Sequence, residues 1–304
     1  MVINKIKLIA ASYLQDRLIF PTKDVAAYDM RVDETFNNRV NIEIPIPSTK
    51  TTKTKNMKPE AVLRGVLCKS IIHNSPTIIF AMGQTQNVEQ ARKFIPESLF
   101  HYFNIILVNY RGYGINNGTK EQKARGSEGI PSAEALEKDI LTVYDYVQKE
   151  FGLNNFYAVG LSLGTSIITY LSKHRPLHGQ LLITPFDNML NQAHDFLISE
   201  YKATDLTHDD VNEILNHKFD SIRNMQNNET PTHIIRAGAD SYVKKPRTDN
   251  LVKHIQNLRS DVTIEHAEHN FDSENPYIIS ALRTAIGTVF RNFMIDCTER
   301  HRAK

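Results

Sequence analysis

The segment from Gly160 to Gly164 reads Gly-Leu-Ser-Leu-Gly and places Ser162 between two glycines. The apolar run from Phe156 to Val159 predicts a strand before it, and the apolar spacing from Leu163 to Leu171 predicts a helix after it. Small residues two positions before and after a serine allow a sharp bend that holds the hydroxyl clear of the backbone. Ser162 is therefore the predicted nucleophile, and an ordinary strand-to-helix turn is the alternative interpretation.

A serine hydroxyl becomes a useful nucleophile when an imidazole accepts its proton and a carboxylate orients that imidazole. Residues that could do this must follow Ser162 and lie just beyond strands. Asp240 comes after the apolar run from His233 to Ala237, and His269 comes after the run from Val262 to His266. We predict Asp240 as the acid and His269 as the base.

Other residues compete for these two roles. His266 is the alternative to His269, but it falls inside the predicted strand, where alternation turns its side chain away from the loop. Asp187 and Asp272 are alternative carboxylates with weaker placement. Asp240 also stands close to a glycine, where an aspartate is common for turn chemistry alone.

Acyl transfer from a serine also needs two backbone N–H groups that meet the oxyanion of the tetrahedral intermediate. The residue after the nucleophile, Leu163, supplies the first. The second is expected from the loop after the apolar run from Thr77 to Met82, where Gln84 is the preferred donor. Gly83 in the same loop is predicted to contact the substrate.

Apolar runs alternate with amphipathic stretches along most of the chain, and the two clearest helices are predicted over Ser132 to Phe151 and from near Pro276 onward. This alternation predicts an α/β protein with a doubly wound, mostly parallel eight-stranded sheet and a ligand site at the carboxyl ends of its strands. We expect one domain over residues 1–304. The predicted strands are Val40 to Ile46, Ala61 to Lys69, Thr77 to Met82, Ile105 to Asn109, Phe156 to Val159, Gln180 to Thr184, His233 to Ala237 and Val262 to His266.

Two segments interrupt the alternation. Ser48 to Lys58 is rich in lysine and threonine and is predicted as a solvated hairpin loop, with phosphate binding as the alternative. Residues 187–230 are too long for a plain connection and are predicted to form a small helical cap. Within this cap-like insertion, Met189 and Phe196 are predicted to contact the substrate, and packing onto the core is the alternative.

Composition bounds the possible functions. The chain has 304 residues with 36 basic and 34 acidic side chains, a net charge of +2 that argues against a dedicated nucleic-acid binder. Its two cysteines, Cys68 and Cys297, lie far apart and form neither a metal-binding pair nor a disulfide framework, which favours a reducing compartment. We expect no signal peptide, no integral membrane segment and a cytoplasmic location.

These motifs resemble the α/β-hydrolase superfamily, in particular its Bem46-like branch close to the serine aminopeptidase-type hydrolases. Asn109 to Gly114 reads Asn-Tyr-Arg-Gly-Tyr-Gly and is similar to the family's Asp-Tyr-Arg-Gly-Tyr-Gly turn. Leu14 to Thr22 is similar to the family's segment ending in Phe-x-Pro, and the Ser162, Asp240 and His269 segments complete the match.

The chain departs from the family pattern at two places. Met82-Gly83-Gln84 stands where the family commonly has His-Gly-Asn, and Arg236-Ala237 stands where it often has His-Gly. These changes put the substrate preference in doubt more than the three predicted catalytic residues. Arg111 in the family turn is expected to pair with a carboxylate or with loop carbonyls as structural support.

The leading hypothesis is a serine hydrolase that cleaves a small carboxylic ester or thioester, or an acylated protein, through an acyl-enzyme. It requires no metal and no organic cofactor. One alternative is a binding protein of the same fold without catalysis. An acyltransferase or a peptidase would use the same residues, and the sequence does not separate these from a hydrolase.

Overall fold

The computed structural model describes residues 17–25, 27, 38–48, 59–116, 118–271 and 275–302. Eight strands form one sheet in the order β1-β2-β4-β3-β5-β6-β7-β8. The pairs β1–β2 and β2–β4 are antiparallel and all other pairs are parallel, so the predicted fold class is confirmed. The strands are β1 (Arg39–Ile46), β2 (Ala61–Cys68), β3 (Thr77–Ala81), β4 (Asn104–Val108), β5 (Phe156–Leu161), β6 (Gly179–Ile183), β7 (Thr232–Ala237) and β8 (Leu258–Ile264).

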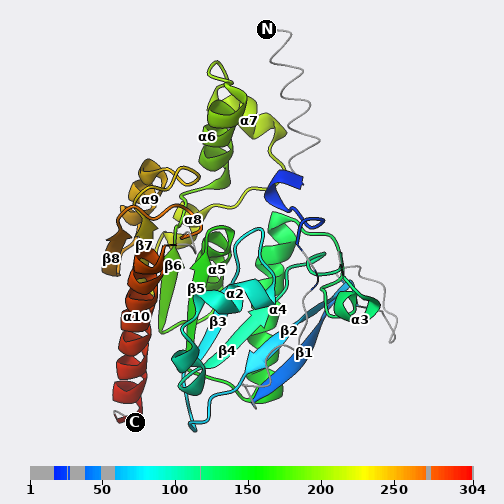
Figure 1. Cartoon of the computed structure of the whole chain (residues 1–304), viewed down its shortest axis with the longest axis vertical. Coiled ribbons are helices and arrows are strands. Elements are labelled where there is room, and N and C mark those ends of the chain that lie inside the picture. The colour runs from blue at the N-terminus through cyan, green and yellow to red at the C-terminus, as the bar shows by residue number, and fades with distance from the viewer. Residues whose placement is uncertain are drawn as a thin grey trace.

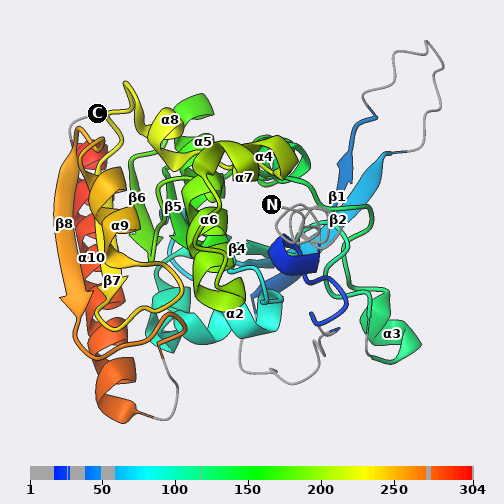
Figure 2. The same ribbon diagram turned by 90° about the horizontal axis from the view of Figure 1, so that it is seen from above.

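Helices connect the strands and cover both faces of the sheet (Figures 1 and 2). They are α2 (Val88–Phe94), the 3-10 helix η2 (Glu97–His101), α3 (Lys120–Lys123), α4 (Ala133–Phe151), α5 (Leu163–His174), α6 (Met189–Tyr201), α7 (His208–Ile214), α8 (Ser221–Met225), α9 (Lys245–Val252) and α10 (Pro276–Arg302). Figure 2 shows α4 and α5 on one side of the central strands and α2 on the other.

Two adjacent residues of β5 show what covers each face of the sheet. Side chains alternate along a strand, so Phe156 and Tyr157 point to opposite faces. The Phe156 ring packs against Tyr144 of α4 with the centroids 4.2 Å apart, and the Tyr157 ring stacks on Phe293 of α10 at 4.5 Å. Strand β5 is therefore covered on both sides, which explains its continuous apolar sequence.

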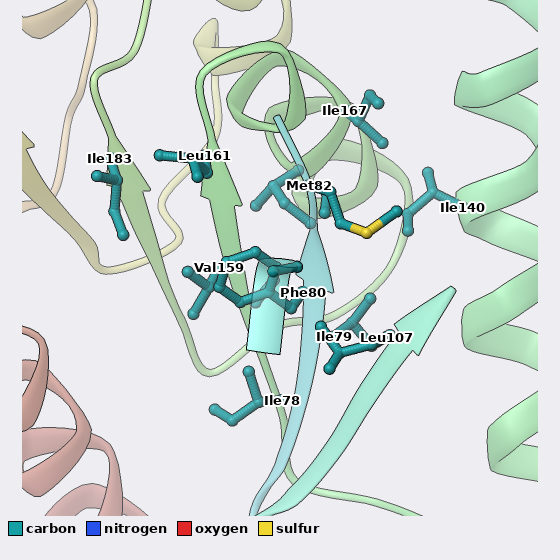
Figure 3. Close-up of a cluster of buried hydrophobic side chains, with 14 of the residues drawn as sticks. Ile78, Ile79, Phe80, Met82, Leu107, Ile140, Val159, Leu161, Ile167 and Ile183 are labelled. Atoms are coloured by element: carbon teal, nitrogen blue, oxygen red, sulfur yellow. The ribbon is translucent and has the colours of Figure 1, made fainter. Parts of the chain in front are cut away.

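A buried apolar cluster surrounds β3 at the centre of the sheet (Figure 3). It gathers side chains from β3, β4, β5 and β6 and from the facing helices α4 and α5, and it fixes the carboxyl ends of β3 and β5 relative to each other. The labelled members are Ile78, Ile79, Phe80, Met82, Leu107, Ile140, Val159, Leu161, Ile167 and Ile183.

The bounds of α4 follow from its capping residues. The Ser132 side chain accepts a hydrogen bond from the Ala135 N–H, which satisfies one of the free donors in the first turn. Gly152 ends the helix with φ 63°, a left-handed conformation that glycine adopts without steric cost.

Among the strands, β8 differs most from its predicted bounds. Strand β8 runs from Leu258 to Ile264 rather than from Val262 to His266. It is an edge strand whose residues are mostly exposed, so its polar first half gives no apolar signal. His266 lies beyond the strand, in a turn with φ 60°. Most of the lysine-rich loop predicted over Ser48 to Lys58 lies outside the described residues.

The insertion at 187–230 contains α6, α7 and α8. Helix α8 packs against α5, whereas α6 and α7 stand out from the carboxyl edge of the sheet (Figure 1). A small apolar cluster separate from the main core joins α6 and α7 and includes Leu197, Ala203, Leu206 and Val211. That this segment acts as a cap stays a prediction.

Helix α10 is long and apolar enough, by length and composition, to cross a membrane. Its apolar side also packs on the sheet, as the core helix of a globular protein does, with Phe290 against Phe103 and Phe293 against Tyr157. The buried face comprises Ile278, Leu282, Ile286, Val289, Phe290, Phe293 and Cys297.

Candidate active site

Ser162 lies at the turn between β5 and α5 with φ 50° and ψ −115°. A serine rarely adopts this conformation, and the surroundings hold it there. The Ser162 N–H donates to the Ile183 carbonyl of β6 at 2.9 Å. A Cβ on Gly160 would lie 2.6 Å from the Gly164 carbonyl oxygen, and a Cβ on Gly164 would lie 2.1 Å from the Ala81 carbonyl oxygen. Both glycines are therefore required by close backbone approach at the bend.

The structure brings the three predicted catalytic side chains into one chain of hydrogen bonds. His269 Nε2 lies 2.9 Å from Ser162 Oγ, and His269 Nδ1 lies 2.8 Å from Asp240 Oδ2. The side chain of Asp240 is 5% exposed and that of His269 is 15% exposed. With Nδ1 donating to the carboxylate, Nε2 is the free acceptor facing the serine hydroxyl.

The Asp240 carboxylate is held by the loop that follows β7. Its Oδ1 accepts the N–H groups of Tyr242 and Val243 at 2.9 and 2.7 Å, which leaves Oδ2 for the imidazole. The Ala239 N–H donates to the Ala267 carbonyl at 2.8 Å and ties this loop to the one that carries His269. Acid and base are thus fixed relative to each other through backbone contacts.

His266 is exposed and takes no part in the hydrogen bonds that join Ser162, His269 and Asp240. It does not lie inside a strand as predicted, because β8 ends at Ile264. The left-handed backbone at His266 reverses the chain there, and the loop then returns His269 to the carboxyl edge.

The loop after β3 presents the second predicted oxyanion donor. The Gly83 carbonyl accepts the Gln86 N–H at 3.2 Å. The Gly83 carbonyl and the Gln84 N–H belong to one peptide group and point in opposite directions. Because the carbonyl faces Gln86, the Gln84 N–H points away from Gln86. In the part of the chain that the structure describes, neither the Gln84 N–H nor the Leu163 N–H has a recorded protein acceptor. The loop itself is fixed by the Gln86 Oε1, which accepts the Gly83 N–H at 3.0 Å.

Two tyrosines of the Tyr-Arg-Gly-Tyr-Gly turn fix the same loop. The Tyr110 hydroxyl donates to the Met82 carbonyl at 2.6 Å, and the Tyr113 hydroxyl donates to the Gln84 carbonyl at 2.8 Å. Burial raises the pKa of both phenols well above the usual range, so both stay protonated donors.

Two cavities meet at Ser162. The first, which we call the apolar chamber, has a volume of about 310 Å³ and lies between Ser162, α6, α7 and residues 17–21. The second, the polar cleft, has a volume of about 420 Å³ and includes Gly83, His269 and Asn270. Both contain Gln84, Thr85, Ser162 and Tyr242, so they are two halves of one site.

Comparison with known proteins bears on the fold. A family model described as alpha/beta hydrolase fold matches residues 76–178. The lysophosphatidylserine lipase ABHD12 of Danio rerio is 28% identical over 96 residues, which cover 30% of this chain and 22% of that protein. The Xenopus tropicalis protein of the same name is 30% identical over the same shares of the two chains. This chain therefore matches less than a quarter of the length of these relatives.

Solved structures match over most of the chain. The esterase Pf2001 of Pyrococcus furiosus superposes with a TM-score of 0.59 at 14% identity, covering 84% of this chain and 91% of its own. Est1E of Butyrivibrio proteoclasticus with bound ferulic acid superposes with a TM-score of 0.54 at 17% identity, covering 77% and 96%. The chain therefore has the α/β-hydrolase fold. The predicted resemblance is confirmed at this level, and the Bem46-like branch stays a prediction.

The other predicted site residues lie in several places. Met189 and Phe196 line the apolar chamber, and Gly83 lines the polar cleft. Asp187 is fully buried and accepts hydrogen bonds from Asn188, Asn191 and Asn250 at 2.7, 2.6 and 2.9 Å, whereas the carboxylate hydrogen-bonded to His269 is that of Asp240. The alternative carboxylate at position 272 lies outside the described residues.

Arg111 has the structural role that the sequence indicated. Its Nε and a terminal nitrogen donate to the two Asp139 carboxylate oxygens at 2.7 Å each, and Glu60 accepts a third bond. The ion pair of Arg111 and Asp139 joins the turn after β4 to α4. Both side chains are almost fully buried, so removing either one would leave an unpaired charge in the interior.

Sequence reasoning missed Tyr242 and the contribution of α7 to the site. The Tyr242 ring lies 5.1 Å from the His269 ring and lines both cavities. The sequence signal that could have identified Tyr242 is its position two residues after Asp240. Val211, Ile214 and Leu215 close the apolar chamber. Within the described residues, no group of three or more His, Cys, Asp or Glu side chains has the arrangement of a metal site.

Proposed function

We propose that this α/β-hydrolase cleaves carboxylic esters or thioesters through Ser162, His269 and Asp240. The observation that carries the proposal is the unbroken hydrogen-bond chain from Asp240 through His269 to Ser162, located where two cavities meet. The names of the similar proteins, a lipase and two esterases, are consistent with ester cleavage.

In the acylation step, Ser162 Oγ forms a bond to the substrate carbonyl carbon while its proton passes to His269 Nε2. The carbonyl oxygen becomes an oxyanion that the N–H groups of Leu163 and Gln84 meet. The bond to the alcohol or thiol then breaks, and the leaving group takes the proton from His269. Asp240 stabilises the imidazolium between these two transfers.

Deacylation repeats the same transfers with water as the nucleophile. His269 Nε2 accepts a proton from water as the water oxygen attacks the acyl carbon. The bond to Ser162 Oγ then breaks, Oγ takes the proton back from His269, and a carboxylic acid leaves. The enzyme returns to its starting state with one ester and one water consumed.

The test combines covalent labelling with turnover. A fluorophosphonate probe should label the wild-type protein, and p-nitrophenyl butyrate should be hydrolysed, whereas Ser162→Ala should lose both. Ser166→Ala is the matched control, because Ser166 is a buried serine one turn further along α5 and should keep both signals. A folded wild-type protein that neither reacts with the probe nor hydrolyses the ester overturns the proposal.

A further inference from the structure

We propose that this site is selective for esters of a medium-length, apolar acyl chain with an alcohol that carries no negative charge. The inference rests on the proposed ester hydrolysis and adds the class of substrate. The proposed catalytic groups that line each cavity indicate how the substrate is oriented. The polarity and charge of each cavity then indicate which acyl chain and which alcohol it accepts.

The apolar chamber has the size and lining of an acyl-chain site. Its walls are mainly apolar side chains, among them Phe186, Met189, Leu197 and Val211. The polar residues of this wall include Arg17 and Gln192. The Gln192 amide nitrogen donates to the Tyr242 carbonyl at 2.7 Å, and its buried Oε1 has no hydrogen-bond partner among the described residues. If a methylene group takes about 30 Å³, the share of one molecule in liquid water, a cavity of about 310 Å³ accommodates about ten carbons.

The position of His269 decides which half of the substrate enters which cavity. His269 lines the polar cleft and does not line the apolar chamber. Because His269 must give its proton to the departing oxygen, the leaving alcohol lies on the side of the polar cleft. Leu163, one of the proposed oxyanion donors, lines the apolar chamber, which places the acyl group on that side.

The charge of the polar cleft then selects among alcohols. Its described lining residues include the exposed carboxylate of Glu268, next to His269, and no lysine or arginine. Gln86, Ser241 and Asn270 supply neutral hydrogen-bonding groups. A phosphate on the leaving group would be repelled by Glu268, whereas a neutral or cationic alcohol would not.

The alcohol selectivity is tested with three decanoyl esters that share one acyl chain. Decanoylglycerol and decanoylcholine should be cleaved with a kcat/KM at least about tenfold above that of decanoylglycerol phosphate. Glu268→Lys should lower this ratio about tenfold, and lower salt should enlarge the change. Glu265→Lys is the matched control, since Glu265 is an exposed carboxylate of the same loop that lines neither cavity. Equal rates for the phosphate and glycerol esters, or equal effects of the two lysine variants, overturn the inference.

The chain-length limit is tested with p-nitrophenyl esters of increasing acyl length. The kcat/KM should rise with length up to about ten carbons and fall beyond it. Ala193→Phe, which fills the chamber wall on α6, should move the optimum to shorter chains. Asn212→Phe on the exposed side of α7 is the control and should leave the optimum unchanged. Rates that do not vary between four and sixteen carbons, or an optimum that Ala193→Phe does not move, overturn this part.

The two proposals fail separately. Fluorophosphonate labelling and hydrolysis of p-nitrophenyl butyrate report the proposed ester hydrolysis by itself. If both persist while the preferences for acyl length and alcohol charge are absent, the substrate class is wrong and the hydrolase remains. If both are lost, the proposed function and the substrate class fail together.

Discussion

The Tyr113 hydroxyl and the Gln84 carbonyl are joined by a 2.8 Å hydrogen bond that crosses from the turn after β4 to the loop after β3. Together with the bond from Tyr110 to Met82, it holds the carbonyl groups on either side of Gly83. The oxyanion donor proposed at Gln84 therefore depends on a neighbouring turn that does not itself line either cavity. This dependence gives the Tyr-Arg-Gly-Tyr-Gly turn a role in positioning the loop.

Tyr113→Phe should lower kcat about tenfold with little change in KM, because the loop loses the bond to the Gln84 carbonyl that helps to hold Gln84, and with it the proposed N–H donor, in position. This decrease in kcat should be smaller than the decrease expected from removing one of the N–H groups that meet the oxyanion. Tyr144→Phe is the control, since the Tyr144 hydroxyl donates to the Pro176 carbonyl away from the site. Steady-state kinetics on p-nitrophenyl butyrate measures both variants. Equal effects of the two changes would show that Tyr113 has no positioning role.

His269→Ala should lower kcat roughly 10⁴-fold, and Asp240→Asn should have an effect of similar size because the imidazole then loses its fixed tautomer. His266→Ala should retain wild-type turnover, since His266 is exposed and lines neither cavity. Circular dichroism checks that each variant is folded. Loss of turnover in His266→Ala with its retention in His269→Ala would reverse the assignment of the base.

The three residues of the hydrogen-bond chain could be picked out from the sequence because each leaves a local signal. Ser162 lies in a five-residue motif between a strand and a helix, and Asp240 and His269 each follow an apolar run. Parallel strands bring their carboxyl ends to one edge of the sheet, so residues distant in the chain meet there. The exact ends of the strands were not needed, and the error in β8 left His269 in the correct place.

The walls of the apolar chamber could not be predicted in the same way. Apolar periodicity reports that one face of a helix is buried, but a face that lines a cavity and a face that packs on the core give the same pattern. Phe196 of α6 and Val211 of α7 therefore carry no distinguishing signal. Likewise, Tyr242 becomes part of both cavities through the path of its loop, which depends on tertiary contacts such as the bond from Gln192.

Gly164→Ala should destabilise the fold, because the added Cβ would lie 2.1 Å from the backbone carbonyl oxygen of Ala81. Relieving that overlap requires α5 to move away from β3, at a cost of roughly 3 kcal/mol in the free energy of unfolding. Gly287→Ala is the matched change inside α10, where an added Cβ meets nothing within 4 Å. It should stabilise by up to about 1 kcal/mol through helix propensity. Urea denaturation compares the two, and similar free energies would contradict the close approach.

The stability of the protein should fall as the pH drops from about 6.5 to about 4 because of His233. Burial of His233 on β7 against Phe293 of α10, with the charge of Arg259 as the second cause, lowers its pKa to about 4 from the ordinary 6.5. In this window the unfolded chain binds a proton that the folded chain does not, so protonation favours unfolding.

The difference between these two pKa values corresponds to roughly 3 kcal/mol of unfolding free energy at pH 4 and below. His233→Asn removes the titrating ring and keeps a polar group near Ser260, which His233 contacts at 2.8 Å. The variant should therefore lose this part of the pH dependence, whereas His73→Asn at an exposed position should retain it. Urea denaturation at pH 4.5 and pH 7.5 measures both. If His233→Asn loses as much stability on acidification as the wild type, another group carries the effect.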